Sequence, residues 1–192
     1  GCNGPGKPAP NDISRMDGND TGNQSFKNPV HIMADWMQFT FMMRFMDAPQ
    51  PDLNPSNSAK RGRQLFDAVG CALCRTPQMR TAPVMNTAVL EDRRGDLFWD
   101  LLLHHMGPGL ADDIIQGQAG PDEFRTSPLW GVGQRMFFLH DGRTDDLLQA
   151  IREHRSDRKG STPASEANAV IDSFYRLPIP DMQAILDFLR SL

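Results

Sequence analysis

Two of the three cysteines in this 192-residue chain form a C-x-x-C pattern, Cys71-Ala-Leu-Cys74, which is followed directly by Arg75. Two thiols at this spacing after a helix can form a disulfide, supply half of a zinc site, or add to the two vinyl groups of a haem. In a haem-attachment motif, the next residue is a histidine that binds the iron. Arg75 cannot bind iron because its guanidinium stays protonated.

The spacing of the cysteines leaves these alternatives open, together with a chance pairing. Zinc is the weakest because no second C-x-x-C or paired histidines supply four ligands. The third cysteine, Cys2, prevents an even disulfide framework. Cys2 could be a lipid-anchor cysteine left by signal processing, a remnant of cloning, or the cut edge of a longer protein.

The charge and hydropathy of the sequence argue against nucleic acid as a partner and against a membrane-spanning segment. The net charge is -4 with acidic and basic residues mixed along the chain, so nucleic acid is not expected as a partner. The most apolar segment, residues 32–46, is interrupted by polar residues and falls short of the ~20 residues that a membrane span requires.

The elements that must position the cysteines are predicted to be helices. Residues 1–28 are rich in Gly, Pro, Asn and Asp and predict an extended arm. Asn28-Pro29 and Asn57-Ser58 are helix start signals, and Gly70 ends the second helix directly before Cys71. No alternation typical of strands is found, so the predicted fold class is all-α with long Gly/Pro-rich loops. The further helices are expected at residues 96–106, 144–154, 165–175 and 180–192.

Several segments, taken in order, closely resemble the C-terminal cytochrome half of the bacterial di-haem oxidoreductase family. These segments are GRQLFDAVGCALCRTPQM, DLLLHHMGPGLADD, GPDEFRTSPLWGVGQRMFFLHDGRTDDLLQAI and ILDFLRSL. The family is sometimes labelled thiol oxidoreductase and is related to di-haem cytochrome c peroxidases. The resemblance covers residues 58–192, and the chain departs from the family's C-x-x-C-H at Arg75.

The resemblance implies a cytochrome-c-like domain at residues 52–192, preceded by an arm and an amphipathic helix at residues 1–51. It also implies one covalent haem c, with thioethers to Cys71 and Cys74. In the related peroxidases, an axial ligand follows the His-Asp-Gly segment by about fourteen residues, and His154 stands fourteen residues after His140. By resemblance, His154 is therefore an axial ligand of the haem iron. The groups expected around the haem edge and its propionates are Arg75, Arg125, Arg135, His140 and Arg143.

Each of these roles has a simpler alternative. His154 at a helix end can act only as a favourable charge at the negative end of the helix dipole. Of His104 and His105, one is expected to face the core or a carbonyl group and the other the solvent. Met106 and Met136 are weak alternative ligands. Packing is the expected role of the cluster Met33, Met37, Met42, Met43 and Met46.

Replacement of the usual histidine by Arg75 predicts one of two functions. If haem is attached, the iron is open on the Arg75 side, and the cation can stabilise negative charge on peroxide or a small ligand. Arg75 is then a candidate catalytic residue of a haem-dependent, peroxidase-like oxidoreductase. If haem is not attached, Cys71 and Cys74 form a disulfide in a structural or interaction module. An ordinary bis-histidine cytochrome altered at one codon is a third alternative.

The expected partners follow from the count of haem motifs. The chain contains no second C-x-x-C-H, so electron transfer requires a redox partner protein or a second haem-bearing chain. Haem c attachment implies a periplasmic or otherwise extracytoplasmic location, which agrees with a lipid anchor at Cys2.

Overall fold

The computed structural model describes residues 35–46, 48–83 and 88–192. It divides into two compact units, Gly1–Asp47 and Ala48–Leu192, and the boundary expected at residues 51/52 stays a prediction. The first unit contains α1 (Asp35–Phe45). Cys2 and the expected helix start at Asn28-Pro29 lie outside the described residues. Within the described residues, no helix is long and apolar enough to cross a membrane.

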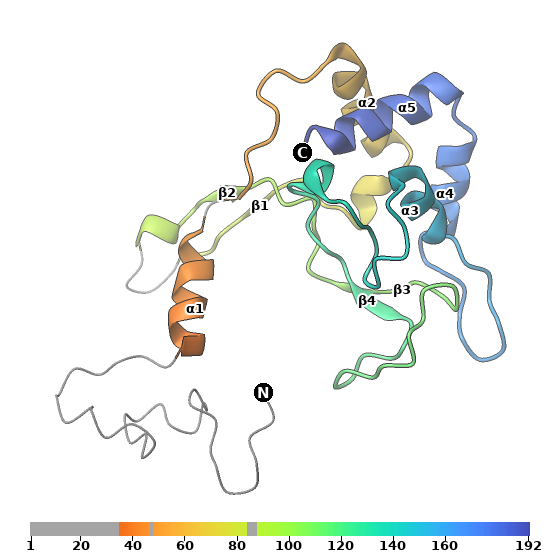
Figure 1. The fold of residues 1–192 in the computed structure, drawn as a ribbon, viewed down its shortest axis with the longest axis horizontal. Helices are drawn as coiled ribbons and strands as arrows, with labels where there is room; N and C mark the ends of the chain where they lie inside the picture. Colours follow the sequence, from red (N-terminus) through yellow and green to blue (C-terminus); the bar gives the residue numbers. More distant parts are fainter. Residues whose placement is uncertain (1–34, 47, 84–87) are drawn as a thin grey trace, which may run out of the picture. The chain divides into compact units, whose positions relative to one another are not determined.

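The second unit combines four helices with two small sheets (Figure 1). Strands β1 and β2 pair antiparallel, as do β3 and β4. A 3-10 turn at Cys71–Leu73 follows the first of the four helices. The elements in chain order are α2 (Asn57–Ala68), β1 (Met79–Arg80), β2 (Arg94–Gly95), β3 (Leu103–His105), β4 (Glu123–Arg125), α3 (Leu147–Glu153), α4 (Asn168–Tyr175) and α5 (Ile179–Arg190).

Helices α2 and α5 pack directly against each other (Figure 1). Gly62 makes this close approach feasible, because a Cβ atom there would lie 1.8 Å from the carbonyl oxygen of Ala184. Phe66 of α2 and Phe188 of α5 meet edge to face at 5.4 Å between ring centroids, an arrangement that adds to the stabilisation from burial. The packed helix pair therefore fixes the end of α2, from which the two cysteines follow.

The prediction of an all-α fold is wrong, because part of the chain forms antiparallel strands. The helix predicted at residues 96–106 is absent from the structure of that segment: Phe98 and Leu101 have φ of 49° and 67°, values that a right-handed helix does not allow. Residues Leu103–His105 instead pair with Glu123–Arg125. The composition of the segment suits a helix, but its backbone hydrogen bonds go to a partner about twenty residues away, which local periodicity does not reveal.

The helices that follow agree with the sequence in type and differ at their ends. α3 begins at Leu147, three residues after the predicted start, and is capped by the Asp146 carboxylate, which accepts from Leu148 N–H at 2.8 Å. His154 is the C-terminal cap of α3. α4 begins at Asn168, three residues after the predicted start.

The hydrophobic core lies between these helices and continues into the walls of a cavity. Its largest fully buried side chains are Phe174 of α4 and Ile185 of α5. The core cluster consists of Ala59, Phe66, Phe98, Val132, Leu147, Phe174, Ile185, Leu186, Phe188 and Leu189.

Candidate functional site

A cavity of about 300 Å³ opens in the second unit, a volume typical of small-molecule and cofactor pockets. The end of α2, the segment from β4 to Leu139, and helices α3, α4 and α5 all contribute to its walls. Most of the lining is apolar, including Phe66, Leu129, Phe138, Ile151 and Phe174. The polar groups in the walls are few, and several are those singled out in the sequence.

Both cysteines of the C-x-x-C line this cavity as free thiols. Gly70 ends α2 with a φ of 98°, a left-handed conformation that suits glycine, and the 3-10 turn Cys71–Leu73 follows at once. Burial raises the pKa of Cys71 to about 12. Burial also raises the pKa of Cys74, and the carboxylates of Asp100 and Glu166 act in the same direction. Both sulfurs are therefore protonated at neutral pH.

Arg75 also lines the cavity, beside the cysteines. Its Nη1 donates to the carbonyl oxygen of Ser127, which fixes the guanidinium in the wall. Burial lowers the pKa of Arg75, and the neighbouring charge of Arg135 contributes. The side chain nevertheless remains a cation, because an arginine is not deprotonated in a protein.

His154 lines the cavity with an imidazole in a defined tautomer. Its Nδ1 lies 2.7 Å from the carbonyl oxygen of Ala150, and since a carbonyl only accepts, Nδ1 carries the proton. Burial lowers the pKa of His154 to about 4, with a further contribution from the positive charge of Arg75. The ring is therefore neutral at pH 7, and its Nε2 carries the lone pair with which a histidine binds a metal.

Further cations lie in the cavity wall. Arg135 and Arg125 both line it, and the guanidinium of Arg125 lies 5.2 Å from the centre of the Trp99 ring. His140 packs against Phe124 with 4.5 Å between ring centroids. Arg143 does not line the cavity; its guanidinium binds the Asp141 carboxylate at 2.7 Å and the Gly109 carbonyl at 2.8 Å.

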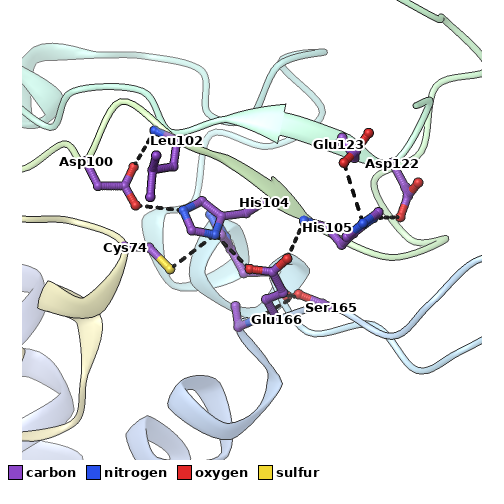
Figure 2. Close-up of polar contacts among 11 residues, drawn as sticks. Cys74, Asp100, Leu102, His104, His105, Asp122, Glu123, Ser165 and Glu166 are labelled. Carbon is purple, nitrogen blue, oxygen red and sulfur yellow. Dashed lines mark hydrogen bonds and ion pairs between the residues drawn. The ribbon is translucent and has the colours of Figure 1, made fainter. Parts of the chain in front are cut away.

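A second group of polar residues surrounds His104, next to Cys74 (Figure 2). His104 Nε2 lies 2.7 Å from Asp100 Oδ2, and its Nδ1 lies 2.8 Å from Glu166 Oε2 and 3.8 Å from Cys74 Sγ. Burial lowers the pKa of His104, but the hydrogen bonds with Glu166 and Asp100 outweigh it, and the pKa is raised overall.

His105 points to the other side of β3, because side chains alternate along a strand. Its Nδ1 lies 2.9 Å from Asp122 Oδ2 (Figure 2). Unlike His104, His105 is not among the residues that line the cavity. Of the two histidines, His104 is the more buried, with a side-chain exposure of 13% against 41% for His105, but its ring contacts carboxylates and not a carbonyl group.

Sequence reasoning singled out neither Asp100 nor Glu166. Asp100 stands four residues before His104, and this i, i+4 spacing was a local signal that could have paired the two. Glu166 lies 62 residues further along the chain, in the loop before α4, and no local pattern connects it to His104. In contrast, Cys71, Cys74, Arg75, Arg125, His140 and His154 had been singled out, and all line the one cavity.

These features make a candidate cofactor pocket: an apolar cavity with two thiols, a neutral imidazole and several cations in its walls. A family model described as "Di-haem oxidoreductase, putative peroxidase" matches residues 38–192. The chain therefore belongs to the di-haem oxidoreductase family, which confirms the resemblance found in the sequence. Membership assigns it to the haem-related oxidoreductases. No curated protein and no solved structure matches the chain significantly.

Proposed function

We propose that this chain binds one haem c in the cavity and serves as an electron-transfer protein or subunit with an altered iron site. Cys71 and Cys74 would hold the haem through thioethers, and His154 would bind its iron. The observation that carries the proposal is the convergence of both thiols and the neutral imidazole on one cavity, although His154 is 80 residues from Cys74 in sequence.

The residues present fit such a group. The apolar walls suit the faces of a porphyrin, and the hydrogen bond from Nδ1 of His154 to Ala150 leaves Nε2 available as a ligand. The cations in the cavity wall, Arg125 and Arg135 among them, suit the two propionate carboxylates of a haem.

Arg75 determines what the iron site can do. A bound haem supplies one-electron chemistry at its iron, and the protein sets what approaches it. Arg75 replaces the usual second ligand with a fixed cation, held by Ser127, which can attract an anionic or polarisable small ligand such as peroxide. As an enzyme, the chain would act as a haem-dependent oxidoreductase with peroxidase-like activity.

The proposed partners and location follow from haem c attachment. A redox partner protein or a second haem-bearing chain would exchange electrons with this site. The location would be periplasmic or otherwise extracytoplasmic, with a lipid anchor if Cys2 is the mature N-terminus.

Attachment is tested by producing the full chain together with haem c maturation machinery. We expect a pyridine haemochrome signal and an intact mass increased by one haem, and a Cys71→Ser, Cys74→Ser double variant should lose both. A colourless protein of unmodified mass, produced beside a cytochrome that does acquire haem, would contradict the proposal.

A further inference from the structure

The group around His104 brings a thiol, an imidazole and two carboxylates close together. The ligand atoms of Cys74, Asp100 and His104 all lie within 4.8 Å of one another. Glu166 adds an oxygen 2.8 Å from the ring of His104. The ring and the Asp100 carboxylate are largely buried, with side-chain exposures of 13% and 7%. Glu166 is 47% exposed, so one side of the group meets solvent.

The two nitrogens of His104 have different neighbours. Nε2 faces Asp100 at 2.7 Å, whereas Nδ1 faces both Glu166 at 2.8 Å and the sulfur of Cys74 at 3.8 Å. A metal-binding histidine commonly donates its other N–H to a carboxylate, which orients the ring. Asp100 can accept the Nε2 proton and orient the ring, while Nδ1, Glu166 and Cys74 face one another as possible metal ligands.

The distances between these donor atoms suit a small divalent cation. Tetrahedral zinc, with Zn–S of ~2.3 Å and Zn–N of ~2.0 Å, holds sulfur and nitrogen about 3.6 Å apart, close to the 3.8 Å between Cys74 Sγ and His104 Nδ1. Nitrogen and oxygen ligands of zinc lie about 3.3 Å apart, so Nδ1 and Glu166 Oε2 would separate by about half an ångström from their contact of 2.8 Å.

We propose that the haem-free chain binds one zinc-class divalent cation through Cys74 Sγ, His104 Nδ1 and Glu166 Oε2, with Asp100 holding the His104 ring. A thiolate, an imidazole and a carboxylate together favour zinc over calcium or magnesium, which prefer oxygen ligands alone. Three protein ligands leave one position for solvent.

The cation and a thioether exclude each other at Cys74. Zinc needs the thiolate, and haem attachment converts the same sulfur into a thioether. The site therefore belongs to the chain before haem is attached and does not depend on attachment taking place. A zinc-loaded chain could not accept haem at Cys74, so the cation would compete with haem attachment.

The test uses the full chain produced without haem maturation machinery, reduced and freed of metal. Titration with Co²⁺ should give a thiolate-to-cobalt charge-transfer band in the near ultraviolet that saturates at one equivalent. Competition with a chromophoric chelator measures zinc affinity. Cys74→Ser and His104→Gln should each weaken zinc binding on the order of 100-fold or more, and Asp100→Asn about 10–100-fold, as for a supporting carboxylate.

Matched controls are available within the same chain. Cys71→Ser removes the neighbouring thiol of the C-x-x-C, and His105→Gln removes the adjacent histidine, so both should retain zinc binding and the cobalt band. Far-UV circular dichroism and thermal midpoints establish that each variant is folded.

Two results would overturn the cation site. One is the absence of a charge-transfer band from the folded parent chain, and the other is an equal loss of binding in Cys71→Ser and Cys74→Ser. Since haem attachment is measured separately by mass on the matured chain, failure of the zinc titration leaves the proposed haem function standing, and the reverse also holds.

Discussion

Arg75 directly follows Cys74, at the position where a haem-attachment motif has its histidine. It lies in the wall of the same cavity as His154, and its charge helps to lower the pKa of that imidazole. A cation next to the thiols cannot replace an iron ligand, but it can favour the approach of an anion. Arg75 therefore favours the binding of an anion in the pocket and does not supply a metal ligand.

Replacing Arg75 with histidine tests this interpretation. In the haem-loaded protein, Arg75→His should restore a second imidazole and give a low-spin visible spectrum that cyanide leaves unchanged. The parent should instead show an open position, with a spectrum that shifts on cyanide addition. Arg75→Gln serves as control, since it removes the charge without adding a ligand and should stay responsive to cyanide. A parent spectrum already low-spin and insensitive to cyanide would contradict the open position.

The elements hold the site through contacts between distant parts of the chain. α2 delivers the cysteines, and α5 holds α2 in place through Gly62, the paired aromatic rings and an ion pair between Arg61 and Asp181 at 2.6 Å. The ion pair is exposed on the arginine side and contributes little. Close packing of the two helices is therefore the main support of the C-x-x-C.

A methyl group at Gly62 should disrupt this contact. In an exposed helix, Gly→Ala would gain about 1 kcal/mol of helix propensity. At Gly62 the new Cβ would lie 1.8 Å from a backbone oxygen of α5, so the helices must separate. We expect Gly62→Ala to lower the free energy of unfolding by roughly 1–3 kcal/mol, as overpacking does, measured by urea denaturation.

Gly120→Ala is the matched control for this substitution, because the nearest atom to its Cβ would be a side-chain oxygen at an ordinary 3.4 Å. Its effect should stay within about 0.5 kcal/mol. An equally small effect for Gly62→Ala would show that α2 and α5 can part without cost.

At the scale of the whole molecule, the buried histidine links stability to pH. The pKa of His154 is lowered to about 4 in the folded chain, against ~6.5 in an unfolded one. The unfolded state therefore binds a proton first, and stability is lost as the pH falls from about 6.5 towards 4. The raised pKa of His104 acts in the opposite sense, stabilising the fold below about 6.5 and losing that contribution as the pH rises through its folded value.

This linkage predicts a difference between variants of the haem-free chain. Between pH 7 and pH 4, the parent should lose roughly 2–3 kcal/mol more unfolding free energy than His154→Gln, which has no titrating ring at this position. Urea denaturation at both pH values measures the difference. If the two proteins lose stability equally, His154 is not a buried neutral histidine in the folded state.

The sequence alone determined much of the pocket. The sequence showed a helix that ends at Gly70 before two cysteines, Arg75 directly after them, and the spacing from His140 to His154. Each of these depends on residues within a few turns of one another or on a motif order that resembles the family's. Helical periodicity also located α2 to α5, with errors of a few residues at their starts.

Only the tertiary structure decided which side chains surround His104 and His105. The pairing of β3 with β4 replaced a predicted helix and turned His104 and His105 to opposite sides. The loop before α4 brings Glu166 within 2.8 Å of His104 Nδ1, which also lies 3.8 Å from Cys74 Sγ. In the sequence, zinc was the weakest interpretation of the C-x-x-C because no further ligands were in view. Those ligands come from segments 30 and more residues away, and backbone pairing and packing over such separations leave no periodic signal in the sequence.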